Sequence, residues 1–487
     1  MSGRAILRIG SVKDVGSFQD HLRALNLQIP CDLEIVAGAQ SPLRWPVDRG
    51  PFKIGNRIAV QPMEGWDATL NGAPSENTFR RWRRFGRSGG KLIWGGEAVA
   101  VCHEGRANPN QLLASPRTQE GLARLRSVLR DEHIRTTGSD DGLLIGLQLT
   151  HSGRYSRPNE NTRPEPRILY RHPLLDRRMK LPPDYPRLSD HEIESIIEAF
   201  HQAAFIAWQS GFDFVDIKHC HGYLGHEFLS AHTRNGRYGG SFEGRTRFLR
   251  EVVQGIRSLC PRLHIGVRLS AIDTVPFHSD PGQSINDKSS TGVAEMCPDL
   301  IPYRWGFGVN PLNPKESDLS ESMRFLSLLE ELGIQLVNIT AGSPYYNPHI
   351  QRPALYPPSD GYLPPEDPLV GVARQMEATR QLKQRFPNLL IVGSAYTYLQ
   401  DFLPNVAQAV VRQGWADFVG LGRMILSYPE LLWEASAGVQ IHRKLVCRTF
   451  SDCTTAPRNG LPSGCYPLDK YYKDSDLAEK LKDIKKG

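Results

Sequence analysis

Short apolar runs recur along the chain, and each is followed by a segment with helical periodicity. Eight of these runs have the length and the β-branched content of buried strands. They lie at residues 58–63, 91–101, 143–151, 212–218, 263–270, 334–341, 389–395 and 417–422. Eight strands that alternate with helices predict an α/β fold, a parallel (β/α)₈ TIM barrel.

The segments between the runs carry helix signals. In residues 189–211, Ser189 and Glu192 form a capping-box pattern, apolar residues then repeat at helical spacing, and Gly211 is placed to end the helix. The other expected helices lie at residues 76–89, 118–131, 244–259, 320–332, 370–386, 399–414 and 429–437. An open doubly wound sheet is the alternative, but QPMEGWDATLNG after the first run lacks the expected G-x-G-x-x-G pattern.

Three parts of the chain are expected. Residues 1–50 form an N-terminal extension that closes the bottom of the barrel, residues 51–440 form the barrel, and residues 441–487 form a tail ending in a short basic helix. Two long loops, 157–188 and 274–315, follow the third and fifth strands. Because loops of this length at the C-terminal face of a barrel are usually functional, we expect them to shape the pocket.

Composition and charge narrow the class of protein. The 487 residues are 40% hydrophobic and 23% charged, which is typical of a globular domain with a large core. No membrane span or secretory signal is evident, and eight scattered cysteines do not suggest a disulfide framework, so a cytoplasmic location is expected. The net charge of +7 includes an arginine cluster at residues 80–87. We interpret that cluster as a solvated helix face and expect no nucleic-acid binding.

The fourth predicted strand leads into DIKHCHGYL, residues 216–224, which places four proton-handling side chains at one strand end. They are Lys218, His219, His221 and Tyr223. In a (β/α)₈ barrel the catalytic residues come from the C-terminal ends of the strands. The cluster therefore marks the candidate active site.

The ends of the last two predicted strands carry glycines and an arginine. Gly393 and Ser394 end the seventh strand, and Gly422 and Arg423 end the eighth. Glycines there let backbone N–H groups approach a phosphate closely, and an arginine adds positive charge. The pattern favours a phosphorylated ligand over glycines that serve only as turn residues.

Gln148 and Arg268, at the ends of the third and fifth strands, would point into the barrel mouth. An amide and a guanidinium suit the N1–C2=O edge of a reduced flavin, which can hold negative charge. A buried arginine in an ordinary ion pair is the alternative.

Motifs between residues 50 and 435 resemble the old yellow enzyme family of FMN-dependent NAD(P)H:flavin oxidoreductases. In chain order they are NRIAVQPM, GEAVAVCHEGRANPNQ, IGLQLTHSGR, DIKHCHGYLGHEFLSAHTRNGRYGGSFEGRTRFLREVV, GVRLSA and ADFVGLGRMI. The resemblance implies a barrel that holds FMN noncovalently. NADH or NADPH would reduce the flavin, which would pass the hydride from N5 to an activated alkene.

The resemblance also implies roles for particular residues. The side chains at positions 218 and 221 would bind the substrate carbonyl oxygen, and Tyr223 would protonate the α-carbon. The positions expected to contact the flavin are Pro62, Met63, Glu64, Ala98, Gln148, Arg268, Gly393, Ser394, Gly422 and Arg423.

Two residues depart from the family pattern. Lys218 stands where the family usually has histidine, and Glu64 stands where it commonly has a small polar residue. We hypothesise that the two pair as one compensated change; the alternative is that Lys218 pairs with Asp216, two residues back on the same strand face. His219 is expected at the surface or behind the site.

Three cysteines follow the barrel. Some longer family members bind a [4Fe–4S] cluster there with four cysteines. The step from Cys453 to Cys465 matches the last part of that pattern, but Cys447 is six residues before Cys453 and the C-x-x-C pair is missing. We therefore expect neither an iron–sulfur cluster nor another metal.

The leading hypothesis is an FMN-dependent oxidoreductase that reduces an activated alkene. Three alternatives stay open. They are oxidative chemistry on an amine or a ring, a Schiff-base lyase that uses Lys218, and a flavin-binding protein without turnover. The expected partner is a small-molecule substrate, and the chain could form a homo-oligomer. The sequence does not choose between NADH and NADPH.

Overall fold

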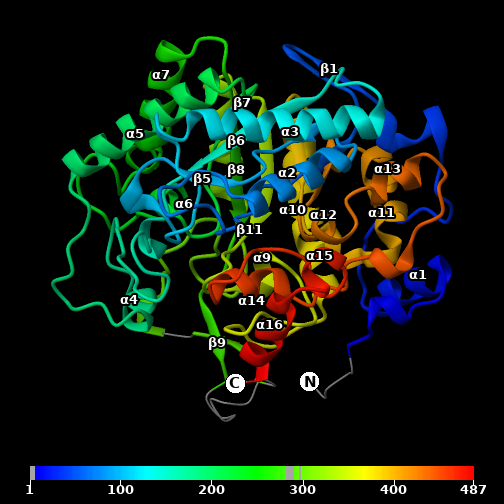
Figure 1. Ribbon diagram of the computed structural model, residues 1–487. Coiled ribbons are helices and arrows are strands. Elements are labelled where there is room, and N and C mark those ends of the chain that lie inside the picture. Colours follow the sequence, from blue (N-terminus) through cyan, green and yellow to red (C-terminus); the bar gives the residue numbers. More distant parts are fainter. Residues whose placement is uncertain (1–5, 281–289, 296–297, 487) are drawn as a thin grey trace.

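The computed structural model describes residues 6–280, 290–295 and 298–486, and its centre is a closed parallel barrel (Figure 1). The strands pair in the order β4-β3-β13-β12-β11-β8-β7-β6-β5, and β4 also pairs with β6, which closes the ring. They are β3 (Ile58–Val60), β4 (Leu92–Ile93), β5 (Ala98–Ala100), β6 (Leu144–Thr150), β7 (Phe214–Ile217), β8 (His264–Ile272), β11 (Leu336–Ala341), β12 (Leu390–Gly393) and β13 (Phe418–Leu421).

Each predicted strand overlaps at least one of these strands, so the predicted (β/α)₈ barrel is confirmed. Strand β8 runs beyond the predicted end at residue 270 to Ile272, and the run at 91–101 forms two short strands, β4 and β5. Gly95 and Gly96 between them have φ values of 86° and 51°. Such left-handed backbone interrupts a strand, and glycine adopts it without steric cost. Both β4 and β5 pair with β6, so together they fill the second position of the barrel.

Helices surround the barrel where the periodicity predicts them. They are α2 (Glu76–Arg87), α3 (Gln119–Thr137), α5 (Asp190–Gln209), α7 (Phe242–Leu259), α8 (Ser320–Glu331), α10 (Pro368–Arg385), α11 (Leu403–Arg412), α12 (Arg423–Ser427) and α13 (Leu431–Ser436). Both hydrogen bonds of the capping box join Ser189 and Glu192. The helix expected from residue 399 begins later, at Leu403, because Pro404 fits only its first turn and Gln400 has a positive φ.

The end of the N-terminal extension and the residues directly after it pack against the bottom of the barrel. The hairpin of β1 (Val47–Arg49) and β2 (Phe52–Ile54) places Val47, Phe52 and Ile54 in one buried cluster with Trp94 and Phe214. In helix α1 (Val15–Ala24), Phe18 stacks on Phe402, the residue before α11, with ring centroids 4.4 Å apart.

The two long loops pack against each other on the C-terminal face. Helix α4 (Pro173–Arg178) lies in the first loop, and the β9 (Phe277–Ser279) and β10 (Gly292–Ala294) hairpin lies in the second. Arg177 and Arg178 form ion pairs with Glu295. The parts of the second loop at 281–289 and 296–297 lie outside the described residues, as do residues 1–5 and 487.

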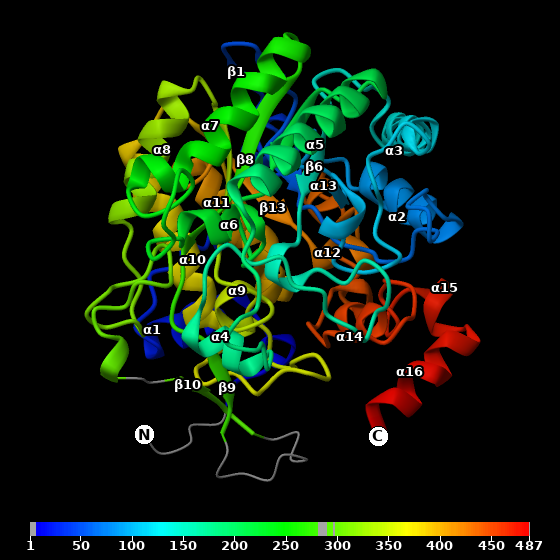
Figure 2. The same cartoon turned by 90° about the vertical axis from the view of Figure 1, so that its left-hand side faces the viewer.

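The tail lies across the mouth of the barrel. Its helices are α14 (Asp452–Arg458), α15 (Lys470–Lys473) and α16 (Asp476–Lys486), and α14 lies beside α9 (Pro348–Gln351) at the C-terminal face (Figures 1 and 2). Ser451 Oγ donates to the carbonyl of Tyr356 at 2.6 Å, and Asp469 forms an ion pair with Arg80 on α2 at 2.8 Å. Within the described part of the chain, no helix is both long and apolar enough to cross a membrane.

Candidate active site

A cavity of about 1230 Å³, counting the space open to solvent, lies at the C-terminal mouth of the barrel. All three predicted catalytic residues line it, as do eight of the ten predicted flavin-contacting residues: Pro62, Met63, Glu64, Gln148, Arg268, Ser394, Gly422 and Arg423. Ala98 and Gly393 lie behind this lining, where their carbonyl oxygens accept hydrogen bonds from Gln111 and Gln61. The strand-end pattern therefore brings most of the predicted site together.

The two predicted cofactor arginines keep unpaired donors. Arg268, on β8, is only 6% exposed, and its Nε has no hydrogen-bond partner among the described residues. Arg423 donates from Nη2 to the carbonyl of Pro353 at 2.9 Å, while its buried Nη1 has no partner within the described ranges. Since buried donors are normally hydrogen-bonded, both guanidinium groups are suited to an anionic ligand.

Asp216 holds the side chain of Gln148, which is predicted to contact the flavin together with Arg268. Gln148 Nε2 donates to Asp216 Oδ2 at 2.5 Å, and the backbone N–H of Arg268 donates to Asp216 Oδ1 at 2.7 Å. Burial raises the pKa of Asp216 to about 6. Because its side chain turns into the barrel towards these donors, the alternative pairing of Lys218 with Asp216 is wrong.

Lys218 instead pairs with Glu64, as hypothesised. Lys218 Nζ donates to Glu64 Oε1 at 2.6 Å and lies 3.8 Å from the centroid of the Tyr223 ring. Tyr223 and Trp66 donate to Glu64 Oε2 at 2.8 and 3.0 Å. Burial and the Glu64 carboxylate hold the pKa of Tyr223 well above its usual value, so the phenol keeps its proton.

His221 is buried beside this cluster in a left-handed backbone conformation, with φ of 66°. Its Nε2 lies 3.2 Å from Thr340 Oγ1 and 3.3 Å from Gln351 Nε2. Burial, followed by the charges of Arg268 and Lys218, holds the pKa of His221 well below its usual value. The imidazole is therefore neutral and acts as a hydrogen-bonding group.

His219 lies behind the site and does not line the cavity. It is 1% exposed, its Nδ1 lies 2.9 Å from the carbonyl oxygen of Ile217, and its ring packs on Phe325. Burial lowers the pKa of His219 to about 4.

A second tyrosine belongs to the site and was not predicted. The hydroxyl of Tyr345 lies 2.7 Å from that of Tyr223, and the ring of Tyr345 stacks on Tyr155 with centroids 3.9 Å apart. Tyr345 lies just after β11 and lines the cavity. Its position after a barrel strand was the available signal, because such loops carry functional groups.

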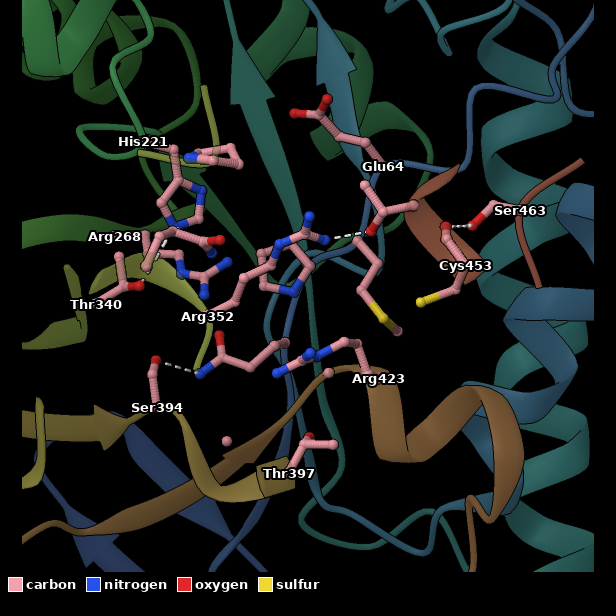
Figure 3. Close-up of a pocket in the computed structure, with 18 of the residues that line it drawn as sticks. Glu64, His221, Arg268, Thr340, Arg352, Ser394, Thr397, Arg423, Cys453 and Ser463 are labelled. Atoms are coloured by element: carbon pink, nitrogen blue, oxygen red, sulfur yellow. Dashed lines mark hydrogen bonds between the residues drawn. The ribbon is translucent and has the colours of Figure 1, made fainter. Parts of the chain in front are cut away.

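Another part of the lining comes from segments of the chain that the sequence did not connect with the site. Arg352 follows α9, and Cys453, Thr454, Arg458 and Ser463 belong to the tail (Figure 3). By contrast, the expected contribution of the long loops is wrong for their described residues, since none of those at 157–188 or 274–315 lines this cavity. The tail takes that place because α14 lies directly over the barrel mouth.

The three tail cysteines have different surroundings. Cys453 lines the cavity, whereas Cys447 is buried and its backbone N–H lies 3.4 Å from Met424 Sδ. Burial raises the pKa of Cys447 to about 11 and also raises that of Cys465. Within the described residues, no group of three or more His, Cys, Asp or Glu is arranged to hold a metal ion.

These observations define a class of protein. A closed (β/α)₈ barrel gathers two arginines with unpaired donors, glycines, a lysine, a histidine and a tyrosine around one cavity at its mouth. This combination is typical of barrel oxidoreductases that bind a phosphorylated flavin.

Comparison with known proteins identifies the family. Residues 42–300 match the NADH:flavin oxidoreductase / NADH oxidase family, and this chain belongs to that family. The resemblance to the old yellow enzymes, which are FMN-dependent oxidoreductases, is thereby confirmed.

The chain is similar to several relatives over part of their length. It is 34% identical over 254 residues to an NADPH dehydrogenase of Clostridium acetobutylicum, which covers 51% of this chain and 68% of that protein. The curated relatives are covered over 60 to 68% of their lengths. Two solved structures share the fold. A 2-naphthoyl-CoA reductase matches with a TM-score of 0.63 and 18% identity, over 89% of this chain and 58% of that chain. A histamine dehydrogenase from Rhizobium sp. 4-9 matches with a TM-score of 0.60 and 20% identity, over 89% of this chain and 53% of that chain.

Proposed function

We propose that this protein is an FMN-dependent NAD(P)H oxidoreductase that reduces an activated carbon–carbon double bond of a small molecule. The observation that carries the proposal is the Tyr223 phenol, held with Lys218 and His221 in the same cavity as Arg268, Gln148 and Arg423. A proton donor and groups for a carbonyl oxygen thus share one cavity with the predicted flavin contacts.

The residues present fit FMN. Arg268 offers an unpartnered donor for the N1–C2=O edge, and Arg423 offers one for the phosphate. Beside Arg423, a Cβ on Gly422 would meet no atom closer than 3.9 Å, so the backbone there is open to a ligand. When bound, FMN would supply reversible hydride transfer between a nicotinamide and the acceptor.

The chain's own residues would then handle the substrate oxygen and the proton. The ammonium of Lys218 has three donors, so it can keep Glu64 with one and bind a carbonyl oxygen with another. A fixed positive charge there stabilises an enolate as it develops. Tyr223 would give its proton to the α-carbon, and the neighbouring Tyr345 hydroxyl would replace it.

Oxidation of a substrate is the second candidate, and the bond between Tyr223 and Glu64 favours it. With the carboxylate as proton acceptor, the tyrosine oxygen could take a proton from a substrate while it passes its own to Glu64. The fold shared with a histamine dehydrogenase is consistent with this direction.

The Schiff-base alternative receives no support. A nucleophilic lysine needs a nitrogen that is free to attack a carbonyl carbon, whereas the Lys218 nitrogen is bonded to the Glu64 carboxylate at 2.6 Å. Trapping with borohydride in the presence of an aldehyde would leave a mass adduct on Lys218 if this reading were right.

The test begins with the absorbance spectrum of the FMN-loaded protein and its anaerobic titration with NADH and NADPH. We expect the flavin bands to bleach with one of the nucleotides and to return when an enal such as cinnamaldehyde is added. Tyr223→Phe should slow the return while it leaves the bleaching unchanged. Reduced flavin that no enal or enone reoxidises, but that forms when amines are added, would replace alkene reduction with the oxidative direction.

A further inference from the structure

The lining of the cavity is strongly cationic. Five of its side chains are lysine or arginine, and among the described residues only one, Glu64, is a carboxylate. The five cationic side chains are Lys218, Arg268, Arg352, Arg423 and Arg458. The carboxylate is already bonded to Lys218, and Arg458 forms an ion pair with Asp360. Arg268, Arg352 and Arg423 are left without a carboxylate within 4.0 Å among the described residues.

Of these three arginines, Arg352 is the one that is not predicted to contact the flavin. One of its nitrogens, Nη1, donates to Thr454 Oγ1 of the tail, and the other, Nη2, is buried without a hydrogen-bond partner in the described part of the chain. Burial and the charges of Arg458 and Arg423 lower the pKa of Arg352 to about 9. A buried donor among like charges is costly unless an anion binds it.

The position of Arg352 relates it to the substrate. The Nε2 atom of the preceding residue, Gln351, lies 3.3 Å from His221 Nε2. His221 is predicted to bind the substrate oxygen, so Arg352 comes directly after a residue that contacts this group. The predicted phosphate contact Arg423 donates to the carbonyl oxygen of Pro353, the residue after Arg352, at 2.9 Å. Arg352 therefore lies between His221 and Arg423 (Figure 3).

We propose that Arg352, with Thr454 and Arg458 of the tail, binds a carboxylate carried by the substrate, at a distance from its reacting double bond. The planar guanidinium matches a carboxylate with two parallel hydrogen bonds, and Arg458 adds charge at the rim. The substrate class is therefore an activated alkene with a distal acidic group. This inference rests on the proposed function, because the double bond is assigned there.

The experiment compares a charged substrate with its neutral twin. Wild type and the variants Arg352→Gln and Arg352→Lys are assayed with 4-carboxycinnamaldehyde and with its methyl ester. Arg352→Gln should lower kcat/KM for the acid by roughly 10- to 100-fold and for the ester by less than about threefold, and Arg352→Lys should recover part of the loss. Arg324→Gln, which removes an exposed ion pair with Glu243 far from the cavity, is the matched control and should change neither.

Two measurements show whether the anion is instead part of the cofactor or of the nucleotide. The Kd for FMN and the rate of flavin reduction by NAD(P)H should stay within about threefold of wild type in Arg352→Gln, less than the loss of one charged hydrogen bond. A large loss in either, with equal effects on acid and ester, would overturn the proposal. It would then assign Arg352 to the FMN phosphate or to the nucleotide.

A binding experiment separates this inference from the proposed function. The pair 4-carboxybenzaldehyde and its methyl ester lacks the side-chain double bond, and its binding is followed by the shift of the flavin bands. If no enal is reduced but the acid still binds more tightly than the ester in an Arg352-dependent way, the anion site stands and alkene reduction fails. If enals are reduced and no preference for the acid exists, the anion site fails and alkene reduction stands.

Discussion

Glu64 is the residue on which the chemistry of the site converges. Its carboxylate accepts hydrogen bonds from Lys218, Tyr223 and Trp66, so it fixes a positive charge and a phenol at the same point. Both Glu64 and Lys218 depart from the pattern of the family. Because the two side chains are in direct contact, we explain the two departures as one joint change. A buried ion pair of this kind loses most when one partner is removed, because the other charge is left uncompensated.

Glu64→Thr alone should therefore harm the protein more than Glu64→Thr with Lys218→His. The Lys218 side chain is only 4% exposed, so its unpaired ammonium should lower the free energy of unfolding by about 3–5 kcal/mol. The double variant removes that ammonium and should regain at least about 1 kcal/mol. Urea unfolding of the four proteins in the cycle measures the coupling, and the rate of enal reduction should follow the same order.

The control for this cycle is the more exposed pair of Arg374 and Glu366, whose side chains are 29% and 24% exposed. Glu366→Thr should cost less than about 1 kcal/mol, because water screens the charge that remains. Additive effects of Glu64→Thr and Lys218→His would show that the two residues do not depend on each other.

Among the elements, α14 covers the mouth of the barrel. It supplies Cys453, Thr454 and Arg458 to the lining, and hydrogen bonds of its N-cap residue and of a residue in its middle join it to the segment after α9. One of these is the bond from the backbone N–H of Ser359 to Thr455 Oγ1, at 3.2 Å. Thr455 is 2% exposed, so water does not replace its hydroxyl easily.

Thr455→Val should weaken the attachment of α14 to the segment after α9 without changing the conformation of the helix. The substitution leaves the Ser359 N–H without its acceptor, which costs about 1–3 kcal/mol of local stability. Amide hydrogen exchange in residues 452–463 should become faster, and FMN should dissociate several-fold faster, while exchange in the barrel strands stays the same. Ser475→Ala, which removes a bond within the tail to Tyr472, is the control and should leave the exchange of α14 unchanged. Unaltered exchange in Thr455→Val would mean that this bond does not hold the tail in place.

For the whole molecule, the sequence predicts the barrel well because its strands and helices differ in period and length. It also predicts the strand-end residues, since parallel strands bring their C-terminal ends to one face. The break at Gly95 was missed because an apolar run does not reveal a backbone turn. Arg352, Thr454 and Arg458 were missed because their place in the site depends on where the tail packs, and no periodicity or motif in residues 441–487 records that contact.

The buried histidines give the whole molecule a dependence on pH. Burial lowers the pKa of each of seven histidines that are at most 9% exposed: His133, His151, His172, His219, His221, His226 and His349. The pKa falls to about 4 for His133 and to about 3 for His226, from 6.5 for an ordinary histidine. Such a group takes up a proton more readily when the chain unfolds. Its contribution to stability is therefore present above the unfolded pKa and is lost as the pH falls towards the folded pKa.

Four buried carboxylates act in the opposite direction. Burial raises the pKa of Asp216 and Asp273 to about 6, that of Glu97 to about 7, and also that of Glu227, so their contribution is lost as the pH rises. Seven groups against four should make the histidines prevail, and the melting temperature should rise between about pH 5 and about pH 7. Scanning calorimetry at constant ionic strength measures this slope. His226→Gln should flatten the slope, because it removes a buried titrating ring behind the cavity. An exposed control, His191→Gln, should not. A melting temperature that falls over this range would show that the carboxylates, not the histidines, set the acid stability of the fold.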